Sequence, residues 1–319
     1  MKYVRMCLLT MTVVAAHLLA AQTSPEPSLA RALALERDGR TAQAIAAAQA
    51  LLDSHSLNEA GTGKAWNILG LAYQDQGSFT RAQHAYEQSI HTFERLPSNI
   101  RDYAMALDDL GGLYLAMGHP DSATAIKKKT FRLYKKVDDH AGMAIVSSDL
   151  AGLALGQKRI RAGRKYLEQA LREVRLANHL DDDNLAAVSS MQGWLAELDR
   201  DVSLSLTTYQ NSLDLWKRRH GEEHPSTGWG YILLGNAKAQ GGQLVAGLAD
   251  MQRGLSILER TLGRRNPRYM KAEMAYSRVL DRTEAHAEAG RVKVAAQQGL
   301  DAFYREQCLD CTISAVGFH

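Results

Sequence analysis

Residues 66–89 read WNILGLAYQDQGSFTRAQHAYEQS, and this stretch decides the fold. Trp66, Gly70 and Tyr73 recur at intervals of four and three residues, which is the spacing of one face of an α-helix. A second stretch with the same spacing follows Gly77, a residue type that suits the left-handed backbone at the end of a helix. The segment therefore predicts two antiparallel helices joined by a tight turn.

The same unit recurs at a nearly constant interval along most of the chain. One position on each first helix is small, where the second helix crosses it: Ala32, Gly70, Gly111, Ala151, Gly193, Gly235 and Ser277. The facing position on each second helix is small as well: Ala44, Ala82, Ala123, Gly163, Ser205, Gly247 and Ala289. The turn between them has glycine in four copies and other residues in three: Gly39, Gly77, Gly118 and Gly242, then Lys158, Arg200 and Glu284. Because a larger side chain at a crossing would separate the helices, we predict seven stacked pairs over residues 27 to 305.

The W-x2-L-G-x2-Y pattern from Trp66 and the A-x3-Y pattern from Ala82 resemble the tetratricopeptide repeat. In the C-terminal half, the length of one repeat can be counted from Pro225 to Pro267. This repeat is longer than the minimal tetratricopeptide unit of about 34 residues. The linkers HGEEHP from His220 and LGRRNP from Leu262 there resemble the kinesin-light-chain type of this repeat. The resemblance implies an all-α fold, an α-solenoid of about seven helix-turn-helix repeats in a right-handed superhelix. It also implies a concave groove, lined by the first helices, that binds an extended peptide or a partner helix.

The N-terminus has the pattern of a secretory signal peptide. Lys2 and Arg5 precede a nearly uncharged apolar run that ends with two small residues, Ala20 and Ala21. We predict a signal peptide over residues 1–21, a linker over 22–27, the repeat array over 28–305 and a tail over 306–319. The mature protein is then periplasmic or secreted and touches the membrane only through its transient signal. A retained N-terminal anchor is the alternative.

Cleavage after Ala21 would leave two cysteines, Cys308 and Cys311, in the C-terminal tail. In an oxidising compartment this C-x-x-C spacing favours a small disulfide loop that caps the last repeat. Residues 312–318 alternate between polar or small and apolar side chains, so a strand that docks on a partner is a second interpretation. Redox or metal chemistry at the two thiols is the third.

Register along the first helices predicts which side chains face the groove. Short polar groups can bond the backbone of a ligand, and aromatic groups contribute large contact areas. The candidate partner-binding residues are Asn67, Gln74, Asp108, Ser148, Ser190, Trp194, Trp229, Asn236 and Arg278. Each of them has a simpler interpretation, in which the side chain faces solvent or packs on the next repeat.

Composition and motifs argue against catalysis and against a nucleic-acid partner. The formal net charge is only +3, too small for an electrostatic footprint on nucleic acid. The sequence has no glycine-rich phosphate loop, no G-x-S-x-G and no H-E-x-x-H. We therefore expect a scaffold, not an enzyme, that binds a protein or peptide and needs no metal and no cofactor. A redox or structural accessory that uses the C-x-x-C tail, and a spacer without a ligand, are the alternatives.

Overall fold

The computed structural model describes residues 25–307, and these residues form helices joined by short turns. No strand is present between residues 25 and 307. The helices are α2 (Pro25–Arg37), α3 (Thr41–Asp53), α4 (Glu59–Asp75), α5 (Phe79–Glu94), α6 (Ile100–Ala116), α7 (Pro120–Lys136), α8 (His140–Gly156), α9 (Ile160–Leu176), α10 (Asp182–Leu198), α11 (Val202–His220), α12 (Pro225–Gln240), α13 (Leu244–Leu262), α14 (Pro267–Leu280) and α15 (His286–Gln307), with one 3-10 turn, η1 (Pro97–Asn99), before α6.

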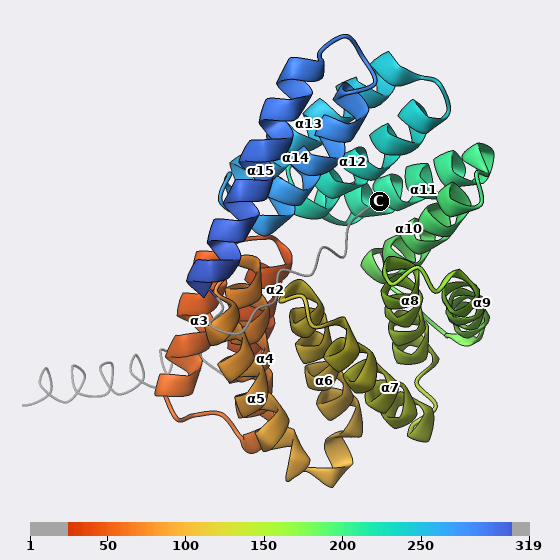
Figure 1. The fold of residues 1–319 in the computed structure, drawn as a ribbon. Coiled ribbons are helices and arrows are strands. Elements are labelled where there is room, and N and C mark those ends of the chain that lie inside the picture. The colour runs from red at the N-terminus through yellow and green to blue at the C-terminus, as the bar shows by residue number, and fades with distance from the viewer. Residues whose placement is uncertain (1–24, 308–319) are drawn as a thin grey trace, which may run out of the picture.

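These fourteen helices form seven consecutive pairs, α2 with α3 through α14 with α15, as the sequence predicts. For most helices the most extensive contacts lie within the pair, and the next most extensive join the second helix of one pair to the first helix of the following pair; α10 is an exception, because it contacts α8 more than α9. Figure 1 shows the pairs stacked side by side along a strongly curved path. The all-α solenoid is thus confirmed, and each pair buries its apolar face against its neighbours.

The predicted small positions lie where the two helices of a pair cross. A Cβ on Gly70 would lie 2.4 Å from the ring of Tyr86, which is fully buried. In the sixth pair the backbones themselves meet, because a Cβ on Gly235 would lie 2.5 Å from the carbonyl oxygen of Gly247. Contacts this short leave no room for a methyl group, which explains why these positions must stay small.

The turn inside each pair requires a left-handed backbone even where glycine is missing. Gly77 has a φ of +79°, and the residues at the same place in the fourth and fifth pairs, Lys158 and Arg200, have φ values of +58° and +61°. Glu284 is the exception, because no positive φ is found at its turn in the last pair. The strain at Lys158 and Arg200 shows that the turn is set by helix packing more than by the local residue.

The ends of the described segment differ slightly from the predicted boundaries. Helix α2 begins at Pro25, so residues 25–27 of the predicted linker form its first turn, where proline is well tolerated. Helix α15 continues to Gln307, into the start of the predicted tail. The predicted signal peptide, and Cys308 and Cys311 with their predicted disulfide, lie outside the described residues. None of the helices described here combines the length and the hydropathy that crossing a membrane requires.

The array curves so strongly that its last pair contacts its first pairs (Figure 1). Phe303 of α15 packs edge-on against Phe79 at the start of α5, with ring centroids 5.4 Å apart. The hydroxyl of Tyr304 donates to the carbonyl of Ala116 at the end of α6, at 3.0 Å. The side chain of Asn266 donates to the carbonyl of Asp75, also at 3.0 Å. Because each contact joins the second or third pair to the last pair, together they close the solenoid into a ring.

Candidate functional site

In the second and third pairs, the groove-facing side chains bond to one another. Asn67 is 4% exposed and its Nδ2 donates to Asp109 at 2.8 Å, while its Oδ1 is buried without a hydrogen-bond partner among the described residues. Asp108 accepts from the buried Nζ of Lys127 at 2.8 Å, and Lys127 also pairs with Asp149 on α8. Two of the predicted contact residues, Asn67 and Asp108, are therefore engaged in internal bonds.

In the fourth and fifth pairs, the candidates offer little free polar surface. Ser148 is buried, with 3% of its surface exposed. Ser190 donates its hydroxyl proton to the carbonyl of Ala187 in its own helix, at 2.8 Å. Trp194 is partly buried and lies against Gly152 of the preceding pair. Packing between repeats thus explains the positions of Ser148 and Trp194, although Trp194 keeps part of its ring accessible.

Further along the groove, three side chains from three different repeats form one polar group. Asn236 on α12 donates to Glu197 on α10 at 2.9 Å. Burial raises the pKa of Glu197 to about 7, and Asn236, Tyr209 and the guanidinium of Arg278 each oppose that rise. Arg278 itself is exposed. The structure therefore places Asn236 and Arg278 near one shared carboxylate, a juxtaposition that register alone did not predict.

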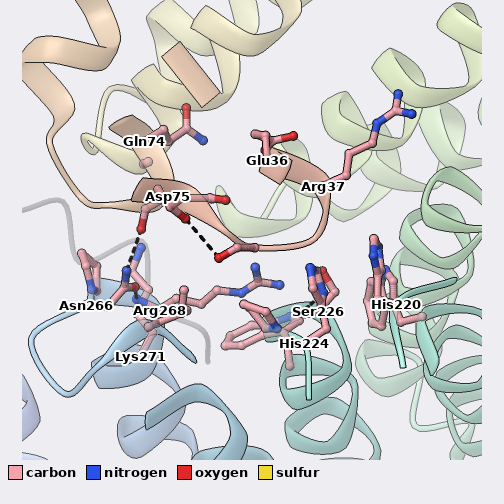
Figure 2. A pocket seen from close by; sticks show the side chains of 18 of the residues that line it. Glu36, Arg37, Gln74, Asp75, His220, His224, Ser226, Asn266, Arg268 and Lys271 are labelled. Atoms are coloured by element: carbon pink, nitrogen blue, oxygen red, sulfur yellow. Dashed lines mark hydrogen bonds between the residues drawn. The ribbon is translucent and has the colours of Figure 1, made fainter. Parts of the chain in front are cut away.

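Where the ends of the array meet, an open cavity of about 550 Å³ lies between the first and last repeats. Its lining comes from the C-terminal ends of α2, α4 and α6 on one side and from the N-terminal ends of α12 and α14 on the other (Figure 2). Of the nine candidates, Gln74 and Trp229 line it. Gln74 also accepts a hydrogen bond from the hydroxyl of Tyr86 at 3.2 Å. The volume lies within the range of ligand-binding pockets.

One wall of the cavity is acidic. Glu36 and Asp75 come from the last turns of α2 and α4, and both side chains are labelled on the same side of the cavity in Figure 2. Burial, followed by the negative charges of Asp75 and Asp109, raises the pKa of Glu36 to about 8. Burial also raises the pKa of Asp75, and the charge of Arg268 opposes this. Neither carboxylate has an ion-pair partner within 4.0 Å among residues 25–307.

The opposite wall is basic. Arg268 and Lys271 lie one turn apart at the start of α14 and both line the cavity. Figure 2 shows the side chain of Arg268 extending toward the middle of the cavity, while the guanidinium of Arg37 points away from it. The guanidinium carbon of Arg268 lies 5.6 Å from the ring centroid of Trp229, a cation–π contact. Burial lowers the pKa of Arg268, and the charge of Asp75 opposes that fall.

Two histidines complete the lining, and they serve as structural groups. The rings of His220 and His224 stack with centroids 3.9 Å apart, and His220 pairs with Asp183 at 2.6 Å. His224 caps α12 by accepting the backbone N–H of Ser226 at its Nδ1. Burial, followed by the charges of His220 and Arg268, lowers the pKa of His224 to about 4, so its ring is neutral at physiological pH. Within residues 25–307, no group of three or more histidine, cysteine or acidic side chains is arranged to hold a metal ion.

Sequence reasoning did not predict most of this lining. Glu36, Asp75, Arg268 and Lys271 sit at helix ends, and Glu36 belongs to the first pair while Arg268 belongs to the last. Register along a helix identifies the concave side of each repeat but not which repeats meet across the ring. The one available signal was that charged residues of opposite sign end or begin the first helices, at Glu36, Asp75 and Arg268.

Comparison with known proteins supports the fold. Residues 61–136 match the family model described as tetratricopeptide repeat. This segment of the chain consists of tetratricopeptide repeats. No curated protein sequence matches it at a significant level. The narrower resemblance to kinesin-light-chain repeats stays a prediction.

Several solved structures have the same fold at low sequence identity. The apo form of RapI has a TM-score of 0.61 at 11% identity, with 88% of this chain and 100% of that chain covered. A Rap protein complexed with Competence and Sporulation Factor has a TM-score of 0.56 at 12% identity, with 89% and 96% covered. The Cut9–Hcn1 assembly of APC/C has a TM-score of 0.56 at 15% identity, with 85% of this chain but only 45% of that chain covered. At these identities the likeness shows the fold alone.

Proposed function

We propose that this protein is a non-enzymatic scaffold that binds a peptide, or a peptide segment of a protein, in the open cavity between its first and last repeats. The observation that carries the proposal is the cavity itself, which has charged groups of both signs and the indole of Trp229 in its lining. Aromatic and charged groups in a concave, partly dry site are what peptide recognition uses. Two similar folds were solved as complexes, a Rap protein with Competence and Sporulation Factor and a Rap conjugation gene regulator with the Phr* peptide.

A peptide selection on the purified chain tests this function. Peptides displayed on phage are selected against the wild-type protein, and the best binder is measured by calorimetry on two variants. Trp229→Ala removes a cavity indole, and Trp194→Ala is the matched control because Trp194 lies on the concave side but does not line the cavity. We expect Trp229→Ala to weaken binding by about tenfold or more, as for a hot-spot residue, and Trp194→Ala to have little effect.

Two results would count against the proposal. In the first, selection enriches no peptide over a control protein. In the second, the enriched peptides bind Trp229→Ala as tightly as wild type. Loss of binding in Trp194→Ala alone would move the site from the cavity to the open groove around α8 and α10. Melting curves of both variants establish that each array is folded.

We also propose that the protein acts outside the cytoplasm, because Lys2, Arg5 and the apolar run to Ala21 form a signal-like sequence. The test is the intact mass of the protein recovered from the periplasm or medium of the expressing cell. We expect a chain that begins near Gln22. A full-length chain in the membrane fraction would instead support the retained anchor.

A further inference from the structure

The charged groups of the cavity are arranged in an unusual way. Glu36 and Asp75 face Arg268 and Lys271 across the cavity, yet no side chain of one wall forms an ion pair with the other within 4.0 Å among the described residues. Ion pairs elsewhere in the molecule are closed at short distance, such as Lys238 with Asp250 at 2.6 Å. In the cavity, by contrast, acidic and basic side chains line the same space without forming an ion pair across it among the described residues.

The pKa values of charged groups on both walls are shifted in the direction that favours the neutral form. The pKa of Glu36 is raised to about 8, mainly because burial removes water and because the charges of Asp75 and Asp109 add to the rise, which the charge of Arg37 only partly opposes. The pKa of Arg268 is lowered, again mainly by burial. An acid and a base that are both poorly compensated, on either side of one cavity, are each stabilised by a ligand group of opposite charge.

We infer that the cavity takes a zwitterionic ligand, a short peptide with free ends, whose ammonium group lies between Glu36 and Asp75 and whose carboxylate lies on Arg268 and Lys271. This inference rests on the proposed function and names the ligand class. A nucleotide or another polyanion would place negative charge on the acidic wall. A polycation would place positive charge on the basic wall. Only a ligand with one charge of each sign satisfies both.

The size and lining of the cavity fit such a peptide. A volume of about 550 Å³ suits a ligand of roughly four residues. Trp229 lies beside Arg268, and Tyr304 lines the cavity from α15, so apolar side chains of the peptide have aromatic surfaces to pack against. Because the walls belong to opposite ends of the array, a bound peptide would bridge the first and last repeats.

A cycle of protein variants and capped peptides tests the inference. The probes are a synthetic library of tetrapeptides with free ends and the same library acetylated, amidated, or both. The best free-ended binder is then measured on wild type, Glu36→Gln and Arg268→Gln. We expect each variant to weaken the free-ended peptide by about tenfold, the loss of one charge-assisted contact. Glu36→Gln should not change the affinity for a peptide whose N-terminus is acetylated. Arg268→Gln should not change the affinity for a peptide whose C-terminus is amidated.

Coupling between a variant and the matching cap distinguishes a direct contact from a general effect. Lys293→Gln is the control, since Lys293 is an exposed charged residue of α15 that does not line the cavity. If capped and free peptides bind equally and the effects simply add, the zwitterion inference is wrong while the peptide-binding function stands. If no peptide binds with or without caps, both the zwitterion inference and the peptide-binding function are wrong. Melting curves of Glu36→Gln and Arg268→Gln confirm that the ring still folds.

Discussion

In the second helix pair the phenol ring of Tyr86 lies against Gly70, and in the third pair the aliphatic chain of Lys127 lies against Gly111 at the same register. Both side chains are buried, yet their polar ends have different surroundings. The hydroxyl of Tyr86 donates to Gln74 of its own pair. The ammonium of Lys127 pairs with Asp108 of its own pair and with Asp149 of the next, so it ties two repeats together.

The comparison shows that the same crossing can be filled by an aromatic ring in one pair and by a buried lysine with its carboxylates in the next. It also shows that the pairing of acidic side chains with cations of the protein differs from one repeat to another. In the third pair the acidic groups of the concave side are balanced by a lysine of the protein, which leaves little charge for a ligand. At the cavity, no cation lies within ion-pair distance of Glu36 or Asp75 among residues 25–307, so both carboxyl groups can accept a group from a ligand.

Removal of the buried lysine should have the largest effect. Lys127→Met keeps the aliphatic stem against Gly111 but leaves Asp108 without its cation. We expect the free energy of unfolding to fall by about 3 kcal/mol, at the low end for a broken buried pair because the side chain of Asp149 is 40% exposed. Urea denaturation of the wild type and the variant at pH 7 measures this difference in the free energy of unfolding.

The matched control for this substitution is Tyr86→Phe, at the same register of the second pair. It removes one hydrogen bond to Gln74 and should lower the free energy of unfolding by about 1 kcal/mol. A second control, Lys127→Met with Asp108→Asn, should recover part of the loss. Equal losses for Lys127→Met and Tyr86→Phe would mean that the ion group adds nothing to the third pair beyond its packing.

A methyl group at the crossing of the second pair should have the next largest effect. The Cβ in Gly70→Ala would lie 2.4 Å from the ring of Tyr86, which has no exposed surface into which to move. We expect a loss of about 2 kcal/mol from overpacking, seen as a lower melting temperature. In Gly111→Ala the Cβ would lie 3.1 Å from the flexible chain of Lys127, so a smaller loss is expected. The opposite order would show that the lysine is held more rigidly than the phenol.

The acidic group of the third pair should make stability depend on pH. Burial, followed by the charge of Asp108, raises the pKa of Asp109 to about 7. Between pH 4 and pH 7 the folded chain therefore holds a proton that the unfolded chain releases, and stability falls as the pH rises through this range. We expect a loss of about 1–2 kcal/mol from pH 6 to pH 7.5 attributable to Asp109.

Thermal melts across this pH range, on wild type and Asp109→Asn, measure that contribution. The variant should show a shallower decline because its amide does not titrate. The neutral ring of His224, whose pKa is lowered to about 4, acts in the other direction and destabilises the fold below pH 6.5 in both proteins. Identical slopes for wild type and variant would exclude Asp109 as a source of the pH dependence.

The fold could be predicted from the sequence because its determinants are local and repeated. Gly70 and Ala82 each mark a crossing, and the same spacing in six other units removes the ambiguity of a single match. The cavity could not be predicted because it depends on the accumulated rotation between repeats, which brings Phe303 to Phe79. Register predicts that Asn67 and Ser148 face the groove, but pattern alone does not reveal that neighbouring side chains bury them.

The smallest effect is expected at a glycine that does not lie at a crossing. Gly112 sits in the interior of α6 directly after Gly111, yet a Cβ there would meet no atom within 4 Å. Alanine has a higher helix propensity than glycine and reduces the freedom of the unfolded chain, so Gly112→Ala should raise the free energy of unfolding by about 0.5–1 kcal/mol. The melting temperature should rise while Gly111→Ala and Gly70→Ala lower it. A loss of stability in Gly112→Ala would mean that this surface of α6 contacts a group that the closed ring of residues 25–307 does not supply, and a ligand or the remaining chain would then be sought there.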